Sequence, residues 1–316
     1  MAHEVETMAY AGEMPWHGLG IKVPADLTPD QMLTVAGLDW EVTKSPVYIH
    51  LNGEEVALDH AALVRATDNK VLDVVSADWN TVQNREAFSF FNDFVAAGDM
   101  EMHTAGSLKG GQIVWVLAKV LGSFELFSGD LIEPYLLFSN FHKYGFSTDV
   151  RFTPIRVVCN NTLNMALGKE ANGIKVSHRR VFDAMEVKTA LGIAKEKMLK
   201  YKEAAEFLGS RKAKEEDIVT YFTRVFPVSA ASKKAEKNEK SRNAVAALKL
   251  LCEQPGAEFA EGTWWPVYNS VSFLTDHVLG RNVDTRLSSA WYGPNRKLKI
   301  GALDTALEMA KVSEVV

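Results

Sequence analysis

Apolar and polar positions alternate through residues 41–76, and this period of two predicts a meander of strands. The stretches SPVYIHL and EVALD flank the dipeptide Asn52-Gly53, which strongly favours a tight hairpin turn. Residues 112–120, QIVWVLAKV, are almost continuously apolar and so indicate a strand buried on both faces. Further strands are predicted over residues 131–138, where Pro134 indicates an edge or a bulge, and over 147–158.

Apolar residues spaced three or four apart predict the helices. The first covers residues 28–36, with Pro29 in a position that suits a first helical turn. The second is capped by Asn84 and runs to residue 97, and its stripe of Phe88 and Phe91 is typical of a buried core. A short helix is predicted over residues 161–167. Beyond residue 173 the chain is predicted to be largely helical, with helices over residues 183–208, 215–225, 244–252, 263–279 and 301–312.

These elements predict an α+β protein: an antiparallel sheet with a β-β-β-α type core and a helical C-terminal half. Residues 1–40 contain many turn signals and are interpreted as an N-terminal arm. Residues 41–181 form the predicted α+β core, and residues 182–316 form a helical region packed on it.

The net charge of −5 hides an asymmetry along the 316 residues. Residues 1–106 carry 17 acids and 5 bases, whereas residues 175–214 carry 11 bases and 5 acids. The basic region is compatible with a local nucleic-acid groove. Two solvated helix faces of opposite charge explain the same numbers, and both interpretations remain open.

The segment from residue 139 to 167, SNFHKYGFSTDVRFTPIRVVCNNTLNMAL, concentrates His142, Lys143, Arg151 and Arg156. Tyr144-Gly145 is predicted to form a turn between two strands. Strand alternation then places Arg151 and Arg156 on opposite faces, which weakens a simple two-arginine clamp.

The run Asn160-Asn161-Thr162 is predicted to open a helix. Its amides and the free backbone N–H groups there suit a phosphate. Ordinary helix capping explains the same residues, so both interpretations stay open. Arg179 and Arg180 end a short strand before a lysine-rich helix, and they are the second candidate phosphate contact.

The two cysteines, Cys159 and Cys252, lie far apart, so neither a disulfide framework nor a cysteine-based zinc site is predicted. The histidines show no close pair at ligand spacing, and nucleotide-binding and serine-hydrolase motifs are missing from the sequence. We predict no metal, no cofactor and no catalytic residue. An enzyme that uses Cys159 or His142 is the least favoured alternative. No apolar run approaches the ~20 residues of a membrane span, and we expect a cytoplasmic protein without a membrane partner.

Several motifs resemble the phage/plasmid-like protein family built on a domain of unknown function, domain nine-three-two. They are ETMAYAGEMPWHGLG from residue 6, Thr81-Val82-Gln83-Asn84, FTPIRVVCNNTL from residue 152, and GTWW and YNSV near residues 262 and 268. Many relatives carry His-Asp-Gly where this chain has His142-Lys143-Tyr144-Gly145, so a role for an acid there is open. The resemblance implies a mobile-element setting and a cytoplasmic protein, and it supplies no activity.

Strands that run directly into a helix over residues 112–167 are also similar in arrangement to the β-β-β-α core of single-strand annealing proteins, such as the phage lambda beta protein and the eukaryotic annealing recombinases. That resemblance implies a ring or filament that binds DNA in a basic groove.

We therefore expect a phage or prophage protein that binds single-stranded nucleic acid and promotes annealing or recombination as a homo-oligomer. The expected contacts are Lys143, Arg151, Arg156, Asn160, Asn161, Thr162, Arg179 and Arg180, with Tyr144 or Phe146 stacking on a base. The alternative is a phage protein-interaction module, a host-defence inhibitor or an assembly protein, whose acidic N-terminal third binds a host protein.

Overall fold

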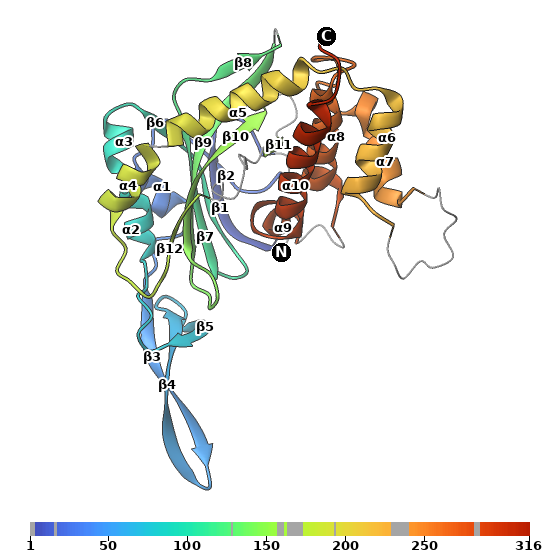
Figure 1. The fold of residues 1–316 in the computed structure, drawn as a ribbon. Helices are drawn as coiled ribbons and strands as arrows, with labels where there is room; N and C mark the ends of the chain where they lie inside the picture. The colour runs from blue at the N-terminus through green and yellow to red at the C-terminus, as the bar shows by residue number, and fades with distance from the viewer. Residues whose placement is uncertain are drawn as a thin grey trace. The chain divides into compact units, whose positions relative to one another are not determined.

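The computed structural model describes residues 4–15, 18–127, 129–156, 161–162, 173–192, 194–228, 240–280 and 285–316. The chain divides into two compact units. The first contains residues 1–121, 135–152 and 173–193, and the second contains residues 122–134, 153–172 and 194–316. Helices and mostly antiparallel strands are both abundant (Figure 1), which confirms the predicted α+β class.

The first unit is built on a long sheet in the order β10-β9-β7-β6-β1-β2, with β12 paired to β10. Its central strand, β7, is buried over most of its length, as the continuous apolar run predicted. The strand bounds are β1 Val5–Ala11, β2 Ile21–Val23, β6 Met100–Leu108, β7 Ile113–Val120, β9 Asp130–Phe141, β10 Thr148–Arg156 and β12 Ile174–Val176.

Strand β1 lies inside this sheet, because it pairs with β6 on one side and with β2 on the other. Its residues are largely buried. The segment interpreted from sequence as an arm therefore supplies a core strand. Glu6 in β1 also accepts two hydrogen bonds from the guanidinium of Arg65, at 2.9 and 3.0 Å, which ties the strand to the neighbouring three-stranded sheet.

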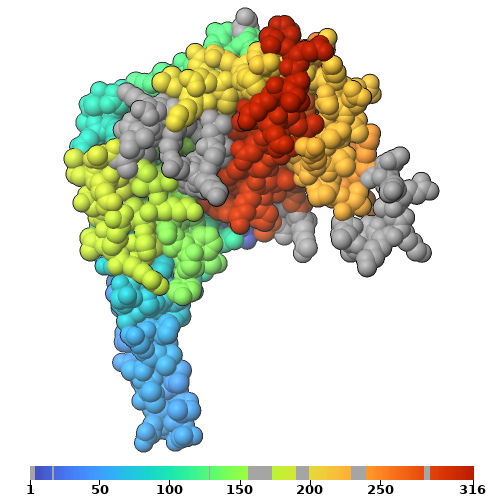
Figure 2. All heavy atoms as spheres, in the orientation of Figure 1, coloured from blue at the N-terminus to red at the C-terminus, as the bar shows by residue number. Residues whose placement is uncertain are grey.

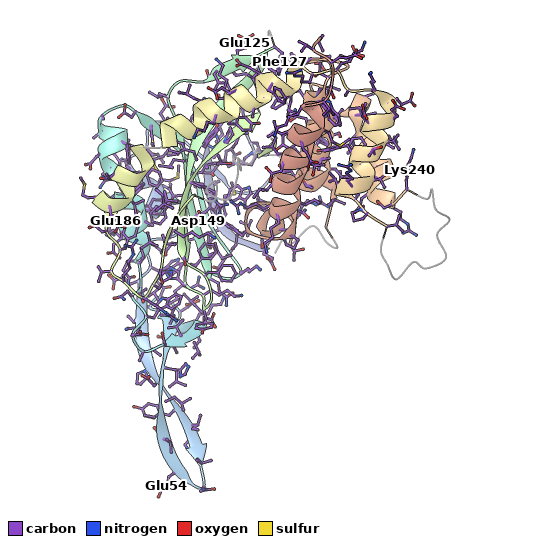
Figure 3. All side chains as sticks on the ribbon, in the orientation of Figure 1. Glu54, Glu125, Phe127, Asp149, Glu186 and Lys240 are labelled. Atoms are coloured by element: carbon purple, nitrogen blue, oxygen red, sulfur yellow. The ribbon has the colours of Figure 1, made fainter. Side chains whose placement is uncertain are left out.

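That second sheet has the order β3-β4-β5 and confirms the predicted meander: β3 is Val42–Leu51, β4 is Glu54–Arg65 and β5 is Lys70–Ser76. Asn52 and Gly53 both have positive φ, 53° and 86°, as a tight hairpin turn requires. The distal part of the β3–β4 hairpin projects from its unit (Figures 1 and 2), and Glu54 marks its tip (Figure 3).

The helices of the first unit pack against strands β6, β7 and β12 of the long sheet. They are α1 Pro29–Val35, α2 Asn84–Ser89, α3 Asn92–Ala96 and α4 Ala184–Gly192. The helix predicted over residues 28–36 is confirmed as α1, with Pro29 in its first turn, and Thr28 caps it through a capping box. The single helix predicted from Asn84 is instead two short helices, and Gln83 occupies the N-cap position. Phe88 and Phe91 are fully buried, which confirms that the aromatic stripe is core.

The second unit is mainly helical. Its core contains Trp264, Trp265, Tyr221 and Phe222, each buried. The helix predicted from residue 263 is confirmed, with Thr263 as its N-cap, although its end is a π-helical turn. The helices are α5 Ala194–Gly209, α6 Glu215–Val225, α7 Arg242–Glu253, α8 Trp264–Phe273, η2 Leu274–Val278, α9 Arg286–Tyr292 and α10 Pro294–Ala310, and β8 Phe124–Leu126 pairs with the first residues of β9.

The helix predicted to begin at Asn161 is wrong at its first residues. Asn161 and Thr162 form strand β11, which pairs with Arg156 and Ile155 of β10. The β10 backbone is thereby satisfied by a ladder, and the amide side chains do not mark a helix start. Residues 163–172, which would hold the rest of that helix of the β-β-β-α core, lie outside the described residues.

Candidate nucleic-acid interface

Two turns lie together at one end of the long sheet in the first unit. The turn between β9 and β10 contains Gly145, whose φ of +80° is readily adopted only by glycine. Strand β12 pairs antiparallel with β10, and Val176 lies opposite Thr148. Because β12 ends where β10 begins, the turn of residues 143–147 is adjacent to residues 177–180. We call these two segments the basic-aromatic end.

Two aromatic side chains of this end face solvent. The exposed fraction is 64% for Tyr144 and 41% for Phe146. The Phe146 ring stacks on the buried Phe141 ring, with centroids 5.0 Å apart and planes 16° apart. The backbone N–H of Tyr144 donates to the Asp73 carboxylate at 2.9 Å. The contacts with Phe141 and Asp73 therefore hold the turn in place, while both rings stay partly exposed to solvent.

Three cations accompany these rings. The Lys143 ammonium donates to the neutral side-chain oxygen of Gln112 at 3.2 Å. Arg179 is exposed, and its backbone N–H donates to the Ser177 hydroxyl. Arg180 is exposed as well, but its guanidinium contacts both carboxylate oxygens of Glu186 at 2.9 Å (Figure 3 labels Glu186). Of these three cations, only Arg180 forms an ion pair within the described residues.

A buried polar network lies beneath the first turn. The Nε2–H of His142 donates to the Asn84 side-chain oxygen at 3.0 Å, because an amide oxygen can only accept. The Asn84 amide then donates to the carbonyl oxygens of Leu38, at 3.0 Å, and Trp40. Asn140 donates to the Val82 carbonyl at 2.7 Å. Strand β9 is therefore fastened to the segment Thr81-Val82-Gln83-Asn84.

A second buried group supports the other turn. His178 stacks on Trp79 with ring centroids 4.2 Å apart. Its Nδ1–H donates to the Asn80 carbonyl at 2.9 Å, and the Asn80 backbone N–H donates back to the His178 carbonyl at 2.7 Å. Segment 79–84 therefore holds both turns of the basic-aromatic end. Sequence analysis missed this role, and its only signal was that motif 81–84 carries the family resemblance.

Both histidines are neutral at physiological pH. Burial lowers the pKa of His142 to about 3, with a smaller contribution from nearby His178. Burial also lowers the pKa of His178. His142 is 1% exposed, so it is a positioning residue within the network.

The structure places Arg151 in an ion pair within β10. It is buried, and its guanidinium pairs with the Asp149 carboxylate at 3.0 Å on the same strand face. This burial and ion pair disfavour Arg151 as a phosphate contact, and the contact predicted from the sequence stays a prediction. The side-by-side positions of Asp149 and Arg151 do follow the predicted alternation (Figure 3 labels Asp149).

The remaining candidates belong to the second unit. Arg156 lies in β10 opposite Asn161, and Thr162 follows in β11. Asn160 and Cys159 lie outside the described residues. The eight predicted contacts are therefore divided between the two units, and within the first unit Lys143, Arg179 and Arg180 lie in the two adjacent turns.

Within the described ranges, no group of three or more histidine, cysteine, aspartate or glutamate side chains is arranged to hold a metal ion. No helix in the described part of the chain combines the length and apolarity needed to cross a membrane.

The family model for a domain of unknown function, DUF932, matches residues 71–291. The chain belongs to the DUF932 family. The matched region contains both turns of the basic-aromatic end and the segment 79–84 that supports them, whereas the β3–β4 hairpin precedes it. No curated protein and no solved structure matches the chain.

Proposed function

We propose that this DUF932 protein binds single-stranded nucleic acid at the basic-aromatic end of its first unit. The observation that supports the proposal is the exposure of Tyr144 and Phe146 in one turn with Lys143, beside the turn of Arg179. Proteins that bind single strands combine aromatic rings, on which bases stack, with cations along the backbone. Tyr144 would stack on a base, and Lys143 and Arg179 would contact phosphates on either side.

The supporting network fits this role physically. Stacking of a base on an aromatic ring contributes ~1–3 kcal/mol, and a ring that is already held in place loses less conformational freedom on binding. Phe141 beneath Phe146 and the Asp73 hydrogen bond to Tyr144 provide that restraint. Arg180 and, in the second unit, Arg156, Asn160, Asn161 and Thr162 remain predicted secondary contacts.

The test is binding of fluorescently labelled oligothymidine, measured by anisotropy over a series of salt concentrations. We expect the logarithm of affinity to fall linearly with the logarithm of salt, by about 0.7 per phosphate neutralised on a single strand. Lys143→Ala combined with Arg179→Ala should reduce this slope by about 1.4. The matched control is Arg85→Ala, an exposed arginine of the same unit that pairs with Asp30.

A separate variant tests the stacking contribution. Tyr144→Ala should weaken binding roughly ten-fold with an unchanged salt slope, because it removes a ring and no charge. Tyr48→Ala is its control, since Tyr48 is 50% exposed on the distal hairpin. Absence of binding at low salt would contradict the proposal and favour the protein-interaction module.

The finer parts of the proposal rest on sequence resemblance. They are a phage or prophage origin, a cytoplasmic location, and annealing or recombination by an oligomer. The similarity to the β-β-β-α core of annealing proteins is weaker than the sequence indicated, because Asn161 and Thr162 form strand β11 where a helix was expected. A strand-annealing assay with two complementary oligonucleotides therefore follows the binding test. Faster annealing that the Lys143→Ala, Arg179→Ala variant loses would support this part.

A further inference from the structure

The distal β3–β4 hairpin exposes apolar side chains that the rest of its unit does not cover. Ile49 is 41% exposed, Leu51 55%, Val56 39% and Leu58 39%. Ile49 lies opposite Val56, and Leu51 lies two residues further along the same strand, so these side chains share one face. Such a two-stranded ribbon is marginally stable in water, whereas three or more strands with an apolar face are stable.

The outer edge of β3, which faces away from β4, is hydrogen-bonded at its first residue. Further along the strand, no other described strand pairs with this edge. The Gln83 side chain accepts from the Val42 backbone N–H and donates to the Val42 carbonyl, both at 2.9 Å, as a neighbouring strand would. Pro46 then interrupts the edge because proline has no N–H. Residues 47–51, VYIHL, follow, and β-branched and aromatic residues of this kind favour strand pairing.

We propose that this edge of β3 pairs antiparallel with the same edge of a second copy of the chain. A two-fold axis at Ile49, the centre of the open run, places Tyr48 opposite His50 of the partner subunit. The two hairpins then form a continuous four-stranded sheet. Every copy carries the same open edge, as an interface with two-fold symmetry requires. The proposal does not depend on nucleic-acid binding.

The charges along the hairpin fit this antiparallel arrangement. Residues 45–64 contain Glu54, Glu55 and Asp59 and neither lysine nor arginine. Lys44 lies at the other end of β3 and is exposed. The same axis points the acidic tip of each hairpin toward the end of the partner's β3 that carries Lys44, whereas a parallel arrangement would place the two acidic tips together. Opposite charges across strands stabilise a sheet, and like charges destabilise it.

Disulfide trapping tests the pairing directly. The background is the full chain with Cys159→Ser and Cys252→Ser, because Cys252 is exposed. Ile49→Cys should form a covalent dimer under mild oxidation, since the two Cβ atoms at the axis lie about 5 Å apart. Val56→Cys is the matched control on the same face of the outer strand, and it should form no covalent dimer. A covalent dimer of Val56→Cys with none of Ile49→Cys would overturn the proposal.

Sedimentation of the native chain over a concentration series provides the second readout. A short edge interface is small, so we expect a dimer that dissociates on dilution. Ile49→Lys should abolish it by placing two lysines face to face, whereas Val56→Lys should not. A chain that stays monomeric throughout, or a dimer that survives Ile49→Lys, would contradict the pairing.

Discussion

The Nε2–H of His142 donates to the side-chain oxygen of Asn84 at 3.0 Å, and this hydrogen bond joins residues that are 58 positions apart in the chain. Asn84 simultaneously satisfies the carbonyls of Leu38 and Trp40. Three segments of the first unit therefore meet at one amide, which is 1% exposed. The turn that presents Lys143 and Tyr144 begins directly after His142, so its position depends on this contact.

Asn84→Ala should lower the free energy of unfolding by about 3 kcal/mol, because it leaves a buried imidazole N–H and two carbonyls without their partner. Urea unfolding followed by circular dichroism measures this loss. Asn92→Ala, an exposed asparagine in the next helix, should change stability by no more than about 0.5 kcal/mol. Equal effects of the two variants would show that the network is not structurally important.

The buried His142 should make the protein acid-sensitive. Its pKa falls from 6.5 to about 3 on burial, so below pH 6.5 the unfolded chain binds a proton that the native chain does not. The contribution to stability is complete above the unfolded pKa and is lost as the pH falls toward 3. About 2 kcal/mol should be lost by about pH 5.

His142→Gln should flatten this dependence between about pH 7 and pH 5, since glutamine can still donate to Asn84 but does not titrate. The measurement is urea unfolding at a series of pH values. His50→Gln, at an exposed hairpin position, serves as the control and should keep the wild-type profile. His178 contributes with the same sign because burial also lowers its pKa, so a residual slope is expected. An unchanged slope in His142→Gln would rule out the assignment.

Arg151 and Arg179 should respond to substitution in opposite ways. Arg151→Met leaves Asp149 buried without its cation, and the expected loss of stability is roughly 3–5 kcal/mol. Oligothymidine binding at a temperature where the variant is folded should keep its salt slope. Arg179→Met should reduce the slope with little change in stability, because Arg179 is exposed. A reduced slope in Arg151→Met would support the phosphate contact that the sequence predicted.

Local signals predicted much of this fold. The Asn52-Gly53 turn, the helix with Pro29 in its first turn and the buried strand β7 each depend on a few adjacent residues, and each prediction was confirmed. Two asparagines were misinterpreted as helix caps, because a partner distant in the sequence decides the structure that each one forms. Asn84 resembles a helix cap but is buried against His142 and two carbonyls, and Asn161 resembles one but pairs with Arg156 in a ladder.

The candidate site was predictable in the same partial way. Strand period correctly indicated that Arg151 shares a face with Asp149. It could not indicate that this face is buried, because burial depends on elements such as β12 that are distant in sequence. The adjacency of Lys143 and Arg179 likewise results from the pairing of β10 with β12. Exposure and long-range pairing therefore decide which of the eight predicted residues lie together at the surface, and neither can be read from local sequence.

The last prediction concerns Lys299 and Asp276, an ion pair in the second unit whose side chains are 0% and 3% exposed. Asp276 lies in the π-helical turn η2, and Lys299 lies in α10. Lys299→Met should destabilise the protein by roughly 3–5 kcal/mol, because it leaves a buried carboxylate without its cation. Adding Asp276→Leu should recover much of that loss, since replacing both partners of a buried pair by apolar groups is often nearly neutral. Urea unfolding of both variants tests this, with Lys297→Met as the exposed control on the same helix. If the double variant is as unstable as the single one, the charge of Asp276 is not what Lys299 compensates, and the pair contributes through packing alone.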